Sequence, residues 1–584
     1  MSFTQRKTPA RLASPAAKKL PRKILFWVMI VYTIAGLFGR DPWKTDDVMG
    51  FASMLSTLES EHWLGSYVDF RPYVEHGPLT SIIGAAAIYL FSPVFELFTS
   101  SLNAQIMASR LPNLLYVFTM LWGIWYGTYL LARRPETQPL PLPFGGEPNP
   151  KDYGRMLADV AFLLLIATVG IVIRIHETSF FPLLLAIHAL AFYGFVRLLD
   201  HPTQATFVLG ITMALAFLTR GFIGLAPLLV VVIGLFITRI YTLRQKVFLF
   251  LALMFATLLC AVWAGSIYTS DLAWLNEWWQ GQMQAFSLQH WAQIPQNLRD
   301  LAWFLWPSWP FALLALWNWR HWFDKAHIFI PTAFIVGNLL LIFSTEYAFE
   351  PEYGPMIIGC VALAAMAIPT LKRSVINLLD WYSIMVVSLI LITVWLGWFA
   401  LYFGYPTQIH RNIMRLLNGF DTAWNLRWFA GIVAGLVICV FWVHLVKWRL
   451  GRNPQAMWRG IVLSAAGTTA TWLLLASLWL PAINYNRSYV KVSESLAQVL
   501  QEKLNDKACV RVQNIGEGQR AAFYAFAHLQ GSQDKNCRFV FLQTTQHNVA
   551  DKTYPYAKQS KVVWQGQRAS ERHGEWFMLL ELSL

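Results

Sequence analysis

The feature that most restricts the fold of this chain is a series of long apolar segments. Helices of about 17 to 25 apolar residues cross a hydrocarbon core of ~30 Å, and fourteen stretches of the 584 residues approach that length. Only 13% of the residues are charged, against ~25% in soluble domains. The sequence therefore predicts an all-α polytopic membrane protein. The segments lie near residues 24–38, 79–98, 107–131, 156–173, 179–196, 204–218, 222–238, 246–268, 301–318, 327–345, 355–371, 379–403, 427–446 and 459–481.

Basic residues between the segments set the number of spans. If all fourteen crossed, the basic loops 132–155, 239–246 and 320–325 would lie outside the membrane, against the positive-inside rule. The segment 79–98 is interrupted by Pro93, and we expect it to lie at the outer interface instead. About thirteen spans then remain, and the basic loops become cytoplasmic. The net charge of +14 is thereby explained by orientation in the membrane, without nucleic-acid binding.

Composition divides the chain into three parts. Residues 1–23 carry seven Lys or Arg and no acid, which predicts a cytoplasmic tail, and 24–483 hold the spans. Residues 484–584 lack spans and predict a small α/β domain on the outer side, with strands at ACVRVQNI, CRFVFLQT and EWFMLLELSL and a helix at GQRAAFYAFAHL. Cys509 and Cys537 in this part are candidates for a disulfide in an oxidising compartment, with two free thiols as the alternative.

Ionisable residues gather where the spans end on the outer side. The stretch TDDVMG, after the first span, presents Asp46 and Asp47. Ionisable groups at membrane depth are costly and usually face a cavity or one another. Simpler structural roles are the alternative for each: an Arg can anchor a span at the headgroups, a His can bond a carbonyl, and an Asp can cap a helix. The other members are Arg71, Tyr73, Glu75, His76, Arg174, His176, Glu177, Arg220 and Tyr353.

Carboxylates and cations at one membrane face suit the transfer of a group from a lipid phosphate. The cations would stabilise the phosphate that leaves, and a carboxylate would take the proton of an acceptor hydroxyl. If the group is a sugar, the transition state has oxocarbenium character, which a carboxylate also favours. A transporter would place its acids nearer the bilayer midplane, on broken helices.

The ordered motifs carry a family resemblance. DPWKTDD, YVEHGPL, ASRLPNLLYVF, RIHET, FLTRGFIGLAPLL and PEYGPMIIGCVALAA, in this order, resemble the GT-C membrane glycosyltransferases of the protein mannosyltransferase and aminoarabinose (lipid A) transferase type. The resemblance covers most of residues 25–370, and the tail that begins INYNRS is similar as well. It implies a GT-C fold with juxtamembrane helices in the first outer loop and a periplasmic C-terminal domain. It also implies an inverting transfer from a polyprenyl-phosphate-linked sugar.

The resemblance also assigns roles to individual residues. It places the catalytic acid-base residue on Asp46, with Asp47 beside it, and a second catalytic acid on Glu177. Tyr353 falls near a tyrosine that contacts the donor phosphate in the relatives. The remaining members of the outer set are expected to bind the donor: Arg71, Tyr73, Glu75, His76, Arg174, His176 and Arg220.

Two departures from the family pattern concern the donor phosphate. His76 stands where the relatives have a lysine that grips this phosphate, and Met49 stands where they have an arginine. We therefore expect a phosphate clamp built differently, from Arg71, Arg174 and Arg220.

Several alternatives stay open at this level. The acceptor is lipid A, another envelope glycan or a secreted protein, and an acceptor that is itself a phosphate would need no base. A divalent metal between carboxylates is an open question, because no metal-ligand spacing demands one. The competing functions are a protein O-glycosyltransferase of the same fold, a lipid-linked sugar flippase, and a scaffold that acts through its outer domain. The family resemblance favours a bacterial inner membrane.

Overall fold

The fold is known from a computed structural model that describes most of the chain. The described residues are 8–12, 17, 20–69, 71–141, 143–286, 293–345, 350–451, 459–503, 509–532, 534, 536–571 and 574–582. The tail expected at residues 1–23 lies partly outside this set.

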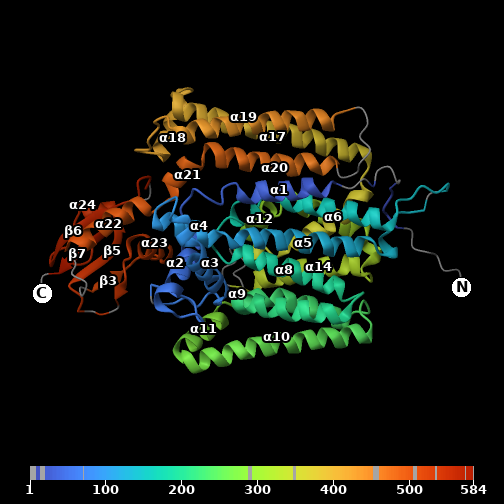
Figure 1. Ribbon diagram of the computed structural model, residues 1–584, viewed down its shortest axis with the longest axis horizontal. Helices are drawn as coiled ribbons and strands as arrows, with labels where there is room; N and C mark the ends of the chain where they lie inside the picture. The colour runs from blue at the N-terminus through green and yellow to red at the C-terminus, as the bar shows by residue number, and fades with distance from the viewer. Residues whose placement is uncertain are drawn as a thin grey trace.

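Long apolar helices lie side by side and form most of the molecule (Figure 1). By length and composition alone, seven helices of the described residues can cross a membrane, and α8 and α16 are shorter apolar helices. The expected class, a polytopic and mostly helical protein with a small C-terminal sheet, is confirmed. The bundle consists of α1 (Arg22–Ile34), α5 (Pro112–Ala132), α6 (Pro150–Ala167), α8 (Phe181–Arg197), α9 (Pro202–Ile237), α10 (Leu243–Ser270), α12 (Ile294–Phe304), α13 (Ser308–Asn318), α14 (Ala326–Ser344), α16 (Met356–Ala367), α17 (Arg373–Phe403), α19 (Leu426–Arg449) and α20 (Arg459–Leu478).

Helix α9 contains a sharp reversal that separates two of the expected spans. Arg220 and Gly221 leave the helical region, and Gly221 has a φ of 60°, which glycine adopts without steric cost. A Cβ atom on Gly224 would lie 2.5 Å from the carbonyl oxygen of Ala216, so the chain doubles back at this point. Both ends of α9 accordingly make hydrogen bonds to the first two turns of α10. The reversal places Arg220 at the tip of a helical hairpin.

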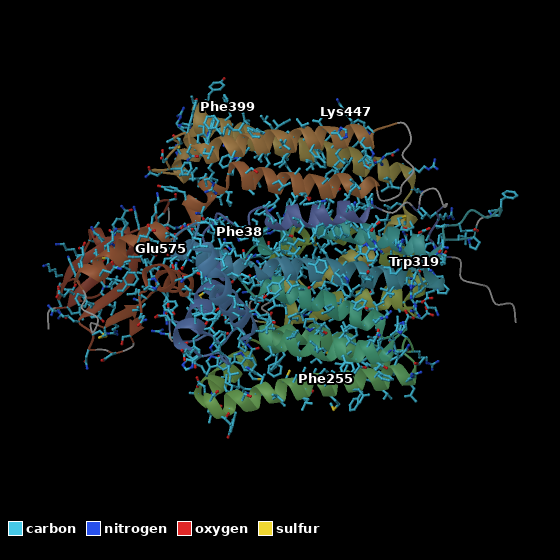
Figure 2. All side chains as sticks on the ribbon, viewed as in Figure 1. Phe38, Phe255, Trp319, Phe399, Lys447 and Glu575 are labelled. Atoms are coloured by element: carbon cyan, nitrogen blue, oxygen red, sulfur yellow. A yellow bond between two sulfur atoms is a disulfide. The ribbon has the colours of Figure 1, made fainter. Side chains whose placement is uncertain are left out.

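The two ends of the bundle differ. Trp319 and Lys447 lie at one end, and Glu575 lies beyond the other (Figure 2). We call the second end, which carries the C-terminal sheet, the sheet end. Short elements collect there: α2 (Asp46–Ser60), the antiparallel pair β1 (Tyr67–Val68) and β2 (Arg71–Pro72), α3 (Leu79–Phe95), α4 (Ser101–Arg110), α7 (Ile171–Arg174), α11 (Leu272–Gln284), α15 (Glu350–Tyr353), α18 (Thr407–Leu416) and α21 (Leu480–Arg487). Helix α3, the segment expected not to cross, packs mainly against α2 and α4.

The C-terminal part is a five-stranded mixed sheet in the order β4-β3-β5-β7-β6. β3 pairs in parallel with β4 and β5, whereas β7 is antiparallel to both β5 and β6. The three expected strands and the expected helix are present, and a disulfide joins Cys509 to Cys537. The elements are α22 (Val490–Lys503), β3 (Val510–Gln513), α23 (Glu517–Ala527), β4 (Gly531–Ser532), β5 (Phe539–Thr545), α24 (Gln546–Ala550), β6 (Ser560–Gly566) and β7 (Glu575–Leu582). Short 3₁₀ turns occur at η2 (Pro135–Thr137), η4 (Arg320–Trp322) and η5 (Ile368–Thr370).

The sheet is attached to the bundle through α2 and α23, which share one apolar core. Polar contacts at the same junction centre on Asp69, in the turn between β1 and β2. Its carboxylate accepts hydrogen bonds from Arg520 at 2.7 Å and from the backbone N–H of Gly531 at 2.7 Å. This docking brings the first turn of α23, with Glu517, to the cavity described next.

Candidate functional site

A cavity of about 1390 Å³ lies at the sheet end of the bundle, between elements that are far apart in the sequence. Its polar side is formed around the start of α2, the end of β2, α7 and the tip of the α9 hairpin. Its apolar side is formed mainly by α18, α20 and α21. Seven of the eleven predicted catalytic and donor-binding residues line it: Asp46, Tyr73, Glu75, His76, Arg174, Glu177 and Arg220.

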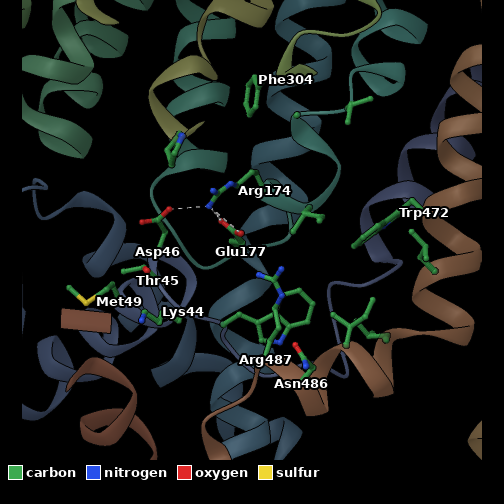
Figure 3. A pocket seen from close by; sticks show the side chains of 18 of the residues that line it. Lys44, Thr45, Asp46, Met49, Arg174, Glu177, Phe304, Trp472, Asn486 and Arg487 are labelled. Carbon is green, nitrogen blue, oxygen red and sulfur yellow. Dashed lines mark hydrogen bonds and ion pairs between the residues drawn. The ribbon is translucent and has the colours of Figure 1, made fainter. Parts of the chain in front are cut away.

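Two carboxylates share one guanidinium on the polar side. Arg174 Nη1 lies 3.0 Å from Asp46 Oδ2 and 3.2 Å from Glu177 Oε2 (Figure 3). Burial raises the pKa of Glu177 to about 7, although Arg174 acts in the opposite direction. The side chain of Asp46 is 32% exposed. Asp46 is therefore a carboxylate that a ligand in the cavity can reach.

The adjacent carboxylate, Asp47, lies outside the lining of this cavity. It is 2% exposed, and its Oδ2 lies 3.3 Å from Arg40 Nη2 and 3.2 Å from Arg110 Nη2. Its Oδ1 accepts hydrogen bonds from the backbone N–H and the hydroxyl of Thr178, both at 2.8 Å. Burial alone would raise the pKa of Asp47, but Arg110 and Arg40, together with Thr178, hold it below the usual value. These contacts fix the first turn of α2 against the loop after α7, and the expected catalytic role of Asp47 stays a prediction that its position does not support.

The loop after α7 is held from a second direction. Asn113, near the start of α5, donates hydrogen bonds to the carbonyl oxygens of Ile175 at 3.1 Å and of Glu177 at 2.8 Å. Asn113 and Arg110 both belong to the quoted motif ASRLPNLLYVF. This motif therefore acts behind the cavity, as a support for the backbone that carries Glu177.

A second polar cluster surrounds Arg220 at the tip of the α9 hairpin. Arg220 Nη2 lies 2.8 Å from Glu352 Oε1, and Nη1 lies 3.0 Å from Nδ1 of His76. Because a guanidinium only donates, His76 Nδ1 is the acceptor. Burial, with the charge of Arg220, lowers the pKa of His76 well below its usual value. His76 is therefore neutral, and its ring packs against Tyr73 and Phe180.

Three further predicted residues do not line the cavity. Arg71 lies on β2 near Asp69 and Arg520, at the junction with the sheet. The ring nitrogens of His176 lie 2.8 Å and 3.1 Å from the carbonyl oxygens of Val172 and Tyr32, so this histidine has the structural role named as its alternative. Tyr353 is 1% exposed and packs against the ring of Phe304. The expectation that these side chains bind the donor is not supported by their positions.

Several residues that line the cavity were not predicted from the sequence. Lys44 stands two positions before Asp46, and Arg487 ends α21. Their motifs, DPWKTDD and INYNRS, were noted only as parts of the resemblance. The presence of Lys44 and Arg487 within these motifs was the available signal, but their meeting at one cavity depends on the fold. Glu352, Asp300 and Glu517 also line the cavity.

Metal ligation was left open by the sequence. Within the described part of the chain, no group of three or more His, Cys, Asp and Glu residues is arranged to hold a metal ion. Two carboxylates of the cavity are paired with arginines, Asp46 with Arg174 and Glu352 with Arg220.

Comparison with known proteins supports the fold. The sequence matches no protein-family model and no curated protein. The structure is similar to the crystal structure of ArnT from Cupriavidus metallidurans bound to undecaprenyl phosphate, with a TM-score of 0.64 over 96% of this chain and 97% of that chain. The apo state of the same protein gives a TM-score of 0.59 with the same coverage. The sequence identity is 14% in both comparisons.

These matches extend over nearly the whole chain and include the bundle and the C-terminal sheet. The chain therefore has the polytopic GT-C fold of ArnT, as the ordered motifs predicted. At 14% identity this likeness concerns the fold.

Proposed function

We propose that the protein is an inverting glycosyltransferase that moves a sugar from a polyprenyl-phosphate carrier to an acceptor at the sheet end of the bundle. The observation that carries the proposal is the cavity itself. It combines a reachable carboxylate, Asp46, and several cations with an apolar wall from α18, α20 and α21. An ArnT structure with this fold is bound to undecaprenyl phosphate, which is the kind of carrier that such a two-sided cavity suits.

The proposed reaction is a single displacement at the anomeric carbon. The bond from this carbon to the phosphate oxygen breaks, and its electron pair stays on the phosphate. A bond from the carbon to the acceptor oxygen forms on the opposite face, which inverts the configuration. The acceptor hydroxyl loses its proton to Asp46. The products are the glycosylated acceptor and a polyprenyl phosphate monoester.

The residues around Asp46 have supporting roles in this scheme. Arg174 fixes the orientation of the Asp46 carboxylate, and it also holds Glu177. A carboxylate beside the sugar favours the oxocarbenium character of the transition state. If the acceptor is a phosphate, no base is required, and Asp46 acts through charge and orientation alone.

We place the sheet end outside the membrane, because this orientation leaves the basic loops in the cytoplasm. The transmembrane catalytic part, 24–483, and the α/β part, 484–584, would then be a membrane and a periplasmic unit of a bacterial inner-membrane protein. The disulfide between Cys509 and Cys537 is consistent with an oxidising compartment. Lipid A or another envelope glycan is the acceptor class that we propose.

The test is mass spectrometry of total lipids and envelope glycans from cells that lack the chain and from cells that carry the active chain. Asp46→Asn is the inactive variant, and Asp534→Asn, an exposed carboxylate in the C-terminal part, is the matched control. We expect a glycosylated product that is lost on deletion, reduced by at least ~10²-fold in Asp46→Asn, and unchanged in Asp534→Asn. A product that persists at the wild-type level in Asp46→Asn would refute the catalytic assignment. A product found on secreted proteins instead would redirect the acceptor class.

A further inference from the structure

The positive charges of the cavity fall into two groups. Arg174 is neutralised by Asp46 and Glu177, and Arg220 is neutralised by Glu352. His76 accepts a hydrogen bond from Arg220 and is neutral. None of these groups offers an uncommitted positive charge to a second anion.

Lys44 and Arg487 form the other group. Both side chains are exposed and line the cavity, and neither makes an ion pair with a carboxylate in the part of the chain that the structure describes. The guanidinium carbon of Arg487 lies 5.8 Å from the centre of the Trp43 ring, next to Lys44 in the chain. Glu517 lines the same cavity but is not paired with either cation. Two uncompensated cations therefore approach the cavity from segments more than 400 residues apart.

A hydrogen-bond network holds these two segments together. The side-chain oxygen of Asn484, on α21, accepts hydrogen bonds from the backbone N–H of Asp41 at 2.8 Å and from the indole N–H of Trp43 at 2.9 Å. The amide nitrogen of Asn484 donates in return to Asp41 Oδ2 at 2.9 Å. The network fixes the start of the Lys44 side chain relative to the end of α21. The two segments that carry Lys44 and Arg487 are thus held together before any ligand binds.

An apolar stripe leads to Arg487. The cavity-lining residues of α20 and α21 recur three or four positions apart, which places them on one face of the two consecutive helices. The stripe consists of Trp472, Leu475, Ala476, Trp479, Leu480 and Ile483 and ends at Arg487. Figure 3 shows Trp472 on the far side of the cavity from Asp46, with Arg487 between them. A long apolar chain along this stripe would bring an anionic head to the two cations.

We propose that Lys44 and Arg487 bind the phosphate of the polyprenyl carrier. This inference rests on the proposed function and names the residues that hold its donor. During transfer the carrier changes from a phosphate diester to a monoester and gains negative charge. Two cations at this position favour that change, because they act where charge develops.

Binding of the carrier tests this assignment separately from transfer. The probes are undecaprenyl phosphate, undecaprenol, and phosphatidic acid as an anionic lipid of another kind. Binding to the full-length protein in detergent is measured by native mass spectrometry. We expect the wild type to prefer undecaprenyl phosphate over both others. Lys44→Met and Arg487→Met should each weaken its binding by about tenfold or more, the effect of losing a hydrogen bond to a charged group.

The matched control is Lys491→Met, an exposed lysine just beyond α21 that lies against Tyr485 and outside the cavity lining. It should bind undecaprenyl phosphate as the wild type does, and Lys44→Arg and Arg487→Lys should retain most of the affinity. Size-exclusion profiles identify any variant that does not fold, and Lys44→Gln or Arg487→Gln, which also removes the positive charge, then takes its place. Asp46→Asn should bind the carrier normally while it loses transfer.

Each other result has a distinct meaning. If the wild type binds undecaprenyl phosphate and the two methionine variants bind it equally well, the clamp is wrong and the proposed function stands. If phosphatidic acid binds as tightly and depends on the same cations, the cations recognise a phosphate other than that of the carrier, and the assignment fails. If the wild type does not distinguish undecaprenyl phosphate from undecaprenol, the proposed function fails with it.

Discussion

Asp46 and Asp47 are neighbours in the sequence but belong to different regions of the molecule. Asp46 faces the cavity and shares Arg174 with Glu177. Asp47 faces the interior, between Arg40 and Arg110. The difference follows from helix geometry, because successive residues of a helix point about 100° apart. An acidic pair at the start of a helix thus provides one carboxylate for a ligand and one that holds the helix in place.

The largest effect that we expect is the loss of stability when the buried carboxylate, Asp47, is removed. Asp47→Ala leaves Arg40 and Arg110 as buried cations without their carboxylate, which costs about 3–5 kcal/mol of stability. We expect Asp47→Ala to yield little folded protein, whereas Asp46→Ala is purified in wild-type amounts because its carboxylate is partly exposed. Size-exclusion profiles in detergent and apparent melting temperatures measure this difference. Equal stability of the two variants would contradict the structural role that we assign to Asp47 alone.

The sequence predicted which residues line the cavity better than it predicted which residues lie behind the cavity and hold it in place. Counting spans from the basic loops predicts that the ends of α1, α6 and α14 and the tip of the α9 hairpin lie on one side, and Asp46, Arg174, Glu177 and Arg220 follow from that. The direction of a side chain does not follow from such a count. For that reason the sequence does not separate Asp47, His176 and Tyr353, which lie outside the cavity lining, from the residues that line it.

Two further differences between the predicted and the observed positions of residues have local causes. Arg71 was placed with the donor, but the turn between β1 and β2 directs this segment toward Asp69 and Arg520 at the sheet junction. Arg487 was missed because its approach to Lys44 depends on contacts between α21 and the segment before α2, which only the folded chain brings together. In the tail, the apolar strands β3, β5 and β7 were predicted, whereas β6, with its exposed residues, was not.

A smaller expected effect is the pH dependence of stability, which differs in sign between the cavity and the buried cluster around Asp47. Glu177 has a pKa of about 7, against a usual value near 4.5, so the folded protein binds more protons than the unfolded chain between these two values. Stability therefore falls as pH rises through this window, by at most about 1.4 kcal/mol per pH unit. The contribution of Asp47 has the opposite sign and is lost only in acid, as pH falls below its usual pKa of 3.8.

The measurement is the apparent melting temperature of the wild type and of Glu177→Gln from pH 5 to pH 8. We expect the wild type to lose stability relative to Glu177→Gln as pH rises, because the variant cannot ionise at this position. Asp534→Asn is the control, and its difference from the wild type should not change over the same range. A constant difference between the wild type and Glu177→Gln would mean that the carboxylate is already ionised throughout.

The smallest expected effect lies at the far end of the helix that carries both aspartates. The hydroxyl of Tyr524, on α23, donates to Glu59 Oε2 at 2.5 Å and ties the end of α2 to the C-terminal sheet. If the buried cluster around Asp47 fixes the start of α2, this contact adds little to the geometry of the cavity. We expect Tyr524→Phe to lower stability by about 1 kcal/mol, the net value of one hydrogen bond, and to leave transfer unchanged. Melting temperatures and product formation by Tyr524→Phe measure the two effects. A large loss of transfer with little loss of stability would show that the docking of the sheet, as well as the Asp47 cluster, determines where Asp46 points.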